Sequence, residues 1–199
     1  MWVWLGADDV DECGRAGATS ARLDRNADFV SARTGGMVES RISFEPIGRI
    51  TTPFESPEGM PIQPTGADAV SGTVEVAESY ADGLQDLAGF SHCILLYVFH
   101  AAPDAAPLEV DPFLDDEPRG VFATRAPRRP NPIGLSVVEI ESVSDREIHV
   151  TGVDVVDGTP LVDIKPFVPE FDVPSDVETG WMTASESTIR SERADERFL

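Results

Sequence analysis

Lysine, cysteine and long apolar segments are all scarce in this chain of 199 residues. The two cysteines, Cys13 and Cys93, are too few for a disulfide framework, and Cys93 lies in an apolar run where we expect a buried free thiol and a reducing compartment. No apolar stretch approaches the roughly 20 residues of a membrane-spanning helix. Residues 1–5 have neither the basic leader nor the apolar length of a secretion signal. We therefore expect a soluble, cytoplasmic protein without a membrane partner.

Two further absences narrow the class of site. No predicted strand is followed by Gly-x-Gly-x-x-Gly and a helix, so a Rossmann-type nucleotide site is not supported. His92, Cys93 and His100 lie close together, but no acidic or cysteine residues accompany them at the spacing of metal ligands. We predict no metal site, and we interpret His92 as a structural residue at the end of a strand.

Lysine is nearly absent from the basic residues. Lys165 is the only lysine, and 36 acidic residues oppose 15 basic ones, for a formal net charge of -21. This balance excludes a generally basic nucleic-acid-binding surface, although it leaves room for a local one. Abundant carboxylates with almost no lysine indicate the high-salt cytosol of a halophilic microbe. An acidic protein of an ordinary cell is the alternative.

One segment runs against this acidity. Residues 119–138 contain no Asp or Glu, but they contain Arg119, Arg125, Arg128 and Arg129. The prolines of the segment, Pro127, Pro130 and Pro132, fix φ and exclude a helix, so the arginines are expected on a stiff connection. A preorganised guanidinium loses little entropy on binding an anion, which predicts a phosphate or carboxylate site. A Pro-rich surface loop is the alternative.

The rest of the pattern predicts a mainly β domain, most simply a small β-barrel with short helices. We expect strands at 41–44, 47–50, 71–76, 90–99, 121–124, 135–143 and 147–156, and the apolar run of 90–99 predicts a strand buried on both faces. Residues 77–87 predict a helical turn, 52–66 and 103–118 predict loops, and a terminal helix is expected within 185–199.

Three regions are expected along the chain. Residues 1–36 show no sustained apolar period and predict a poorly ordered extension, with Met37 as an alternative start. Residues 37–172 form the predicted domain. Residues 173–199 form an acidic C-terminal segment, in which we expect Trp181 and Met182 to dock on the domain.

Four motifs in order resemble one known family. They are Phe-Ala-Thr-Arg-Ala-Pro-Arg-Arg-Pro-Asn-Pro-Ile-Gly-Leu-Ser at 122–136 and the stretches at 46–64, 87–100 and 157–166. Together they resemble the TrmO family, also called TsaA-like or VirR-like, of S-adenosylmethionine-dependent tRNA methyltransferases. The resemblance implies a TsaA-like β-barrel, S-adenosylmethionine as methyl donor, and a homodimer with the site near the subunit boundary.

The resemblance also implies which residues hold the donor. They are Pro61, Ile62, Gln63, Phe99, His100, Arg125, Leu135, Asp154, Val155, Val156 and Asp157. The amide of Gln63 offers donors and an acceptor to an adenine or a carboxylate. From the sequence alone, Asp154 and Asp157 are equally suited to binding ribose hydroxyls, holding a cation or forming an Asp-Gly turn.

The implied reaction is methylation of N6 of the threonylcarbamoylated adenosine beside the tRNA anticodon. His100 and Asp157 are the predicted proton acceptors. The residues predicted to face the RNA phosphates or the threonyl carboxylate are Arg128, Arg129, Asn131 and Lys165. Lys165 has two further interpretations, as a partner of Asp163 or as a surface residue retained by chance. Two rival functions stay open: a methyltransferase for a small molecule or protein, and a non-catalytic regulatory module that binds S-adenosylmethionine.

Overall fold

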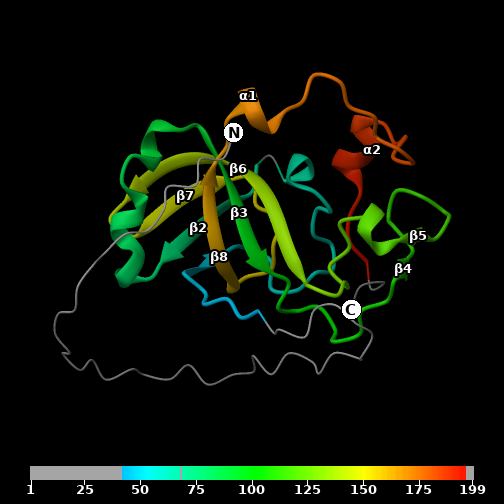
Figure 1. The fold of residues 1–199 in the computed structure, drawn as a ribbon, viewed down its shortest axis with the longest axis horizontal. Coiled ribbons are helices and arrows are strands. Elements are labelled where there is room, and N and C mark those ends of the chain that lie inside the picture. Colours follow the sequence, from blue (N-terminus) through cyan, green and yellow to red (C-terminus); the bar gives the residue numbers. More distant parts are fainter. Residues whose placement is uncertain (1–41, 68, 196–199) are drawn as a thin grey trace, which may run out of the picture. The chain divides into compact units, whose positions relative to one another are not determined.

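Alternating apolar and polar residues build the body of the protein. The computed structural model describes residues 42–67 and 69–195, so the predictions for 1–36, for Met37 and for Arg41 lie outside the described residues. Six antiparallel strands close a barrel in the order β1-β2-β7-β6-β3-β8 (Figure 1). Their bounds are β1 (Gly48–Thr51), β2 (Ser71–Val76), β3 (His92–Val98), β6 (Ile133–Ser144), β7 (Glu147–Thr151) and β8 (Thr159–Pro166). The predicted mainly β barrel with short helices is confirmed.

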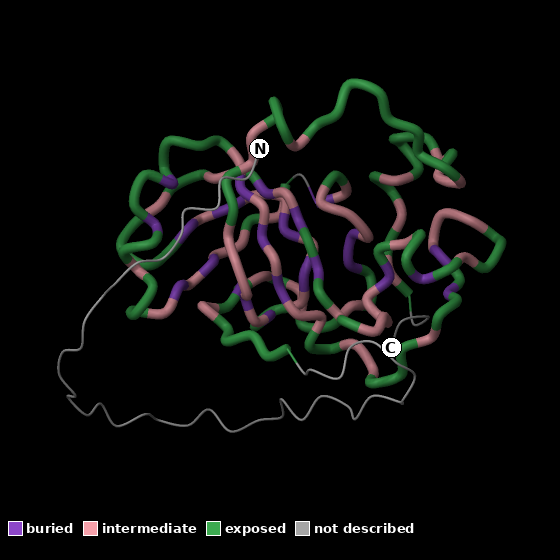
Figure 2. Tube along the Cα trace, viewed as in Figure 1, coloured by how far each residue is buried: buried purple, intermediate pink, exposed green. Residues whose placement is uncertain are grey.

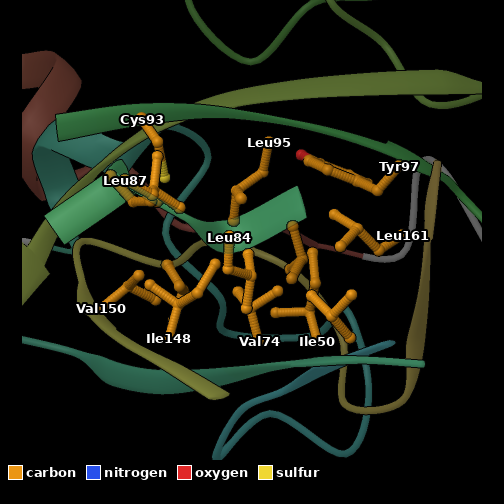
Figure 3. Packing of buried hydrophobic residues seen from close by; sticks show 14 residues of the cluster. Ile50, Val74, Leu84, Leu87, Cys93, Leu95, Tyr97, Ile148, Val150 and Leu161 are labelled. Carbon is orange, nitrogen blue, oxygen red and sulfur yellow. The ribbon is translucent and has the colours of Figure 1, made fainter. Parts of the chain in front are cut away.

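The core fills the barrel with the inward-facing side chains of every strand. Ile50, Val74, Leu95, Ile148 and Leu161 are almost completely buried and pack together in the interior (Figure 3). Burying such side chains stabilises the fold by about 1.5–3 kcal/mol each. Figure 2 shows the buried positions recurring along the strands, which is the two-residue period of a sheet with one face inside.

Strand β3 differs from its prediction. Cys93, Leu95 and Tyr97 are buried, whereas Ile94 and Leu96 between them are only partly buried. A barrel strand has one inner and one outer face, so its apolar run cannot be buried equally on both. Cys93 is a buried free thiol, as predicted, and burial raises its pKa to about 11.

Several short elements surround the barrel. They are the 3-10 turns η1 (Pro64–Gly66), η2 (Glu78–Leu84), η3 (Leu87–Gly89) and η4 (Val121–Ala123), the short strands β4 (Glu109–Val110) and β5 (Arg119–Gly120), and the helices α1 (Pro169–Asp172) and α2 (Glu186–Ser191). Among the described helices, none has the length and apolar character that a membrane crossing requires.

Four local predictions were wrong. Residues 42–44 form no strand, and the strand predicted at 147–156 ends at Thr151. The loop predicted at 103–118 contains β4, which pairs with β5. The strand predicted at 121–124 is the turn η4, because the amide and the hydroxyl of Thr124 both donate to the carbonyl of Val121.

Residues 173–195, here called the C-terminal strap, connect two loops at one end of the barrel. Trp181 Nε1 donates to the carbonyl of Ala123 over 2.9 Å, which confirms the predicted docking of Trp181. Ala194 exchanges backbone hydrogen bonds with Gly59 and Met60 over 2.9 and 2.8 Å. The strap also contains α2, capped by Ser185 and placed against η1 (Figure 1). The strap therefore fixes the loop before η1 and the turn η4 relative to the barrel.

Candidate active site

A cavity of about 1470 Å³ opens between the barrel and the loops that the C-terminal strap holds. Its walls come from the ends of β3 and β6, from the loops at 60–65, 122–131 and 152–156, and from the C-terminal strap. Ligand pockets commonly measure about 300–1,000 Å³. The cavity is therefore large enough for a nucleotide-sized ligand together with part of a second molecule.

Most of the predicted donor-binding residues line this cavity, although they are far apart in the sequence. Those that line it are Pro61, Ile62, Gln63, Phe99, His100, Arg125, Leu135, Asp154, Val155 and Val156. The guanidinium of Arg125 donates through Nη1 to Gln63 Oε1 over 3.5 Å, so two of the motifs meet directly. The fold thus brings the motifs to one place, and their binding roles stay predictions.

Asp157 lies outside the cavity lining. Its Oδ1 accepts from the backbone amide of Thr52 over 3.0 Å, and its own amide donates to the carbonyl of Phe54 over 2.7 Å. Gly158 follows with a φ of +73°, a left-handed conformation that favours glycine. Of the interpretations open for Asp157, the structure shows the Asp-Gly turn. The hydrogen bonds of Asp157 with Thr52 and Phe54 join this turn to the chain after β1.

Asp154 ends a buried chain of hydrogen bonds. Ser136 donates through Oγ to Asp154 Oδ1 over 2.5 Å, and the hydroxyls of Tyr97 and Ser136 lie 3.0 Å apart. Tyr97 and Ser136 are 3% and 1% exposed. Desolvation raises the pKa of Asp154 to about 6, against the opposing effects of its hydrogen bonds and of the charge of Arg125. Desolvation and the charge of Asp154 likewise raise the pKa of Tyr97.

His100 is held through its ring. Its Nδ1 lies 3.3 Å from Thr159 Oγ1, and Thr159 donates its own proton to the carbonyl of Val156 over 2.6 Å. The Thr159 hydroxyl therefore accepts from Nδ1–H, a tautomer in which Nε2 of the neutral ring carries a lone pair. Desolvation lowers the pKa of His100, and the charge of Asp157 partly offsets this effect.

Three arginines of residues 119–138 occupy different environments. Arg125 is exposed and lines the cavity. Arg129 also lines it, but its Nη1 donates to the carbonyls of Thr124 and Ala126 over 3.1 and 3.4 Å, so it braces the loop. Arg128 is not part of the cavity lining, and its buried Nε has no hydrogen-bond partner among the described residues.

The other predicted substrate-binding residues are also separated. Asn131 is exposed and lines the cavity. Lys165 lies on β8 outside the cavity lining and pairs with Asp163, with Nζ 2.6 Å from Oδ2. Of the interpretations open for Lys165, the structure shows the pair with Asp163. Within residues 42–67 and 69–195, no group of three or more His, Cys, Asp or Glu side chains could hold a metal ion.

Three polar residues beneath the cavity support the predicted site residues. Ser136, Thr159 and Tyr97 had no assigned role, yet they hold Asp154 and His100 in place. A signal for Ser136 was present, because it occupies an inward-facing position of β6 between Gly134 and Val138. A polar residue at a core position must find a hydrogen-bond partner.

Fold and site together define the class: a small closed antiparallel β-barrel with a large ligand cavity at one end, lined by both apolar and charged side chains. Residues 49–173 match the family described as the tRNA-methyltransferase O N-terminal domain, TrmO_N. The chain belongs to the TrmO family.

Two proteins and one solved structure illustrate what the chain is similar to. A protein of Pyrococcus abyssi, described as a probable S-adenosyl-L-methionine-binding protein, is 47% identical over 79% of this chain and 85% of its own length. The tRNA (adenine(37)-N6)-methyltransferase of Escherichia coli is 41% identical over 65% of this chain and 59% of its own length. The crystal structure of TrmO from Pseudomonas aeruginosa superimposes with a TM-score of 0.60 and 38% identity over 71% of this chain. The chain spans 63% of that structure's length.

Proposed function

We propose that this protein methylates N6 of the threonylcarbamoylated adenosine beside the tRNA anticodon, with S-adenosylmethionine as the methyl donor. The observation that carries the proposal is the convergence of distant motif segments on one cavity, with Arg125 and Gln63 in contact there. The names of the relatives support the donor, and the name of the Escherichia coli relative supports an adenine of tRNA as acceptor.

The residues of the cavity fit such a donor. The guanidinium of Arg125 suits a carboxylate, and the amide of Gln63 beside it suits either a carboxylate or an adenine edge. Phe99, whose ring packs edge-on against Tyr97 at 5.4 Å, together with Leu135 and Val156, provides apolar walls for a purine. When bound, S-adenosylmethionine supplies an electrophilic methyl group on a cationic sulfur.

The protein's own contribution to the rate is largely positioning. Holding two reactants in line supplies on the order of 7 kcal/mol or more of barrier reduction. His100 is one proposed proton acceptor because its Nε2 has a lone pair in the tautomer set by Thr159. Asp157 is the other proposed proton acceptor, and its charge also favours the protonated form of His100.

The acceptor would contact residues 119–138, here called the arginine segment. We assign Arg128 and Asn131 to RNA phosphates or to the threonyl carboxylate, and Lys165 to a more distant phosphate. Arg129 holds the loop that presents them. The homodimer, the cytoplasmic location and the high-salt host stay predictions, and light scattering of the purified protein tests the dimer.

The experiment is incubation of the protein in high salt with labelled S-adenosylmethionine and total tRNA from its host, followed by nucleoside analysis. We expect label in methylated threonylcarbamoyladenosine. Donor binding without labelled tRNA would favour the rival methyltransferase with a small-molecule or protein acceptor. Donor binding without transfer to any acceptor would favour the regulatory module.

A further inference from the structure

We propose that Asp154, held by Ser136 and Tyr97, is the catalytic residue that accepts the proton released from the acceptor nitrogen. This inference rests on the proposed function and deepens it, because it replaces His100 and Asp157 as proton acceptors. It also moves Asp154 from the donor-binding set to the acceptor side of the cavity.

The geometry gives the hydrogen-bond chain one direction. Ser136 uses its only hydroxyl proton to donate to Asp154 Oδ1 at 2.5 Å, so at the 3.0 Å contact with Tyr97 it is the acceptor and Tyr97 is the donor. Both hydroxyls are almost completely buried and cannot turn toward bulk water instead. The result is a carboxylate whose Oδ1 is fixed by a donated hydrogen bond, in a side chain that lines the cavity.

The surroundings of Asp154 suit a group that changes its protonation state near neutral pH. The titratable and charged groups that act on it are Tyr97 from β3 and Arg125 from the arginine segment, and Arg125 and the Ser136 hydroxyl both favour the carboxylate. Desolvation favours the neutral acid, and the balance leaves the pKa at about 6. A proton acceptor is most effective when its pKa lies close to the working pH.

The other two candidates are less well placed. Asp157 lies outside the cavity lining and its Oδ1 already accepts from the amide of Thr52. His100 is exposed and is held by one 3.3 Å contact, whereas Asp154 is held at 2.5 Å by a buried partner. Acceptors that are fixed before the reaction need less reorganisation during it.

The N6–carbon bond forms with the nitrogen electron pair while the methyl–sulfur bond breaks, and that bond pair stays on sulfur, which becomes a neutral thioether. The N6 proton passes to Oδ2 of Asp154, giving a neutral methylated amide nitrogen and a neutral carboxylic acid. The proton then leaves to water through the open cavity, which restores the carboxylate.

The test compares wild-type protein with Asp154→Asn and with Asp145→Asn, a carboxylate change in the β6–β7 turn that is remote from the cavity. In Asp154→Asn the side chain still accepts from Ser136 but cannot take a proton. We expect its single-turnover methyl transfer to tRNA to fall at least about 100-fold, while donor affinity, measured by calorimetry without tRNA, changes less than threefold. Asp145→Asn should behave as wild type in both measurements.

Two further variants separate proton transfer from mere structural support. Ser136→Ala and Tyr97→Phe remove or weaken the hydrogen bond that lowers the pKa of Asp154. The acid limb of the pH–rate profile, expected near pH 6 in the wild type, should therefore move to higher pH, with much of the rate recovered at pH 8. A purely structural role would lower the rate equally at every pH, which would contradict the proposal.

Other outcomes overturn it in distinguishable ways. If Asp154→Asn loses donor binding in parallel with transfer, Asp154 is a ligand of the donor. If Asp154→Asn stays active while His100→Gln loses transfer, His100 is the proton acceptor. If the wild-type protein transfers no label to tRNA, the proposed function fails first, and this inference fails with it.

Discussion

At the scale of single residues, the ring of Tyr97 leaves no room for a side chain at Gly134. The two residues are direct partners across β3 and β6, and a Cβ at Gly134 would lie 2.7 Å from Tyr97 Cδ2 and closer still to the ring edge. We predict that Gly134→Ala lowers the free energy of unfolding by about 2–3 kcal/mol, because the buried ring has little room to move. Gly89→Ala is the matched control, since nothing lies within 4 Å of its Cβ position. Denaturant unfolding measures both, and equal stability of the two variants would contradict the packing argument.

Two adjacent arginines are predicted to behave differently. Arg129→Ala leaves the carbonyls of Thr124 and Ala126 without their donor, which should cost about 1–3 kcal/mol of stability. Arg128→Ala removes a buried Nε that has no hydrogen-bond partner within residues 42–67 and 69–195, so the free energy of unfolding should change by less than about 0.5 kcal/mol. Thermal unfolding compares their stabilities. A filter-binding assay should show weaker tRNA binding for Arg128→Ala, and a greater loss of stability in Arg128→Ala than in Arg129→Ala would reverse these assignments.

At the scale of elements, the C-terminal strap determines how the cavity loops are held. Trp181 donates to the carbonyl of Ala123, and the guanidinium of Arg119 lies 5.7 Å from the centre of its ring. Trp181→Phe keeps a ring but removes the donor, so we expect a loss of about 1 kcal/mol in stability and weaker donor binding in calorimetry. Phe171→Leu, on α1 and 72% exposed, is the control and should leave both unchanged. Unchanged donor affinity in Trp181→Phe would show that the strap does not organise the cavity.

The elements also show where sequence reasoning succeeds and where it stops. The period of two in 71–76 and 136–143 predicted barrel strands, because a strand with one buried face leaves that pattern in any sequence. The residues of η4 have the same β propensity, yet two hydrogen bonds from Thr124 close a turn there. The motifs indicated which residues share a cavity, but the link from Tyr97 to Asp154 depends on side chains 57 positions apart, and spacing alone does not reveal it.

At the scale of the whole molecule, charge is the dominant property. A formal charge of -21 implies strong self-repulsion at low ionic strength, and the exposed ion pairs of Glu75 with Arg49 and Arg146, at 3.6 Å each, offset little of it. The Debye length falls from about 10 Å at 0.1 M salt to about 3 Å at 1 M. We therefore predict that the melting temperature rises from 0.1 M to 2 M KCl, measured by scanning calorimetry. Sucrose at matched osmolality serves as the control, and a falling melting temperature would contradict adaptation to high salt.

The same charge predicts an unusual salt dependence for tRNA binding. Each neutralised phosphate normally lowers the logarithm of affinity with a slope of about -0.9 against the logarithm of salt concentration. Under the proposed function the arginine segment would provide few phosphate contacts, and salt would also screen the repulsion between tRNA and the 36 acidic residues. The two effects oppose each other, so we expect a slope shallower than about -2 between 0.1 M and 1 M KCl. Near 0.1 M, where the repulsion is screened least, we expect the affinity for tRNA to rise as salt is added. Fluorescence anisotropy of labelled tRNA measures the slope, and Arg128→Ala should move the affinity at the low-salt end further down. A steep slope of about -5 or beyond would reveal a large basic surface outside the arginine segment, and tRNA would then dock somewhere other than at this cavity.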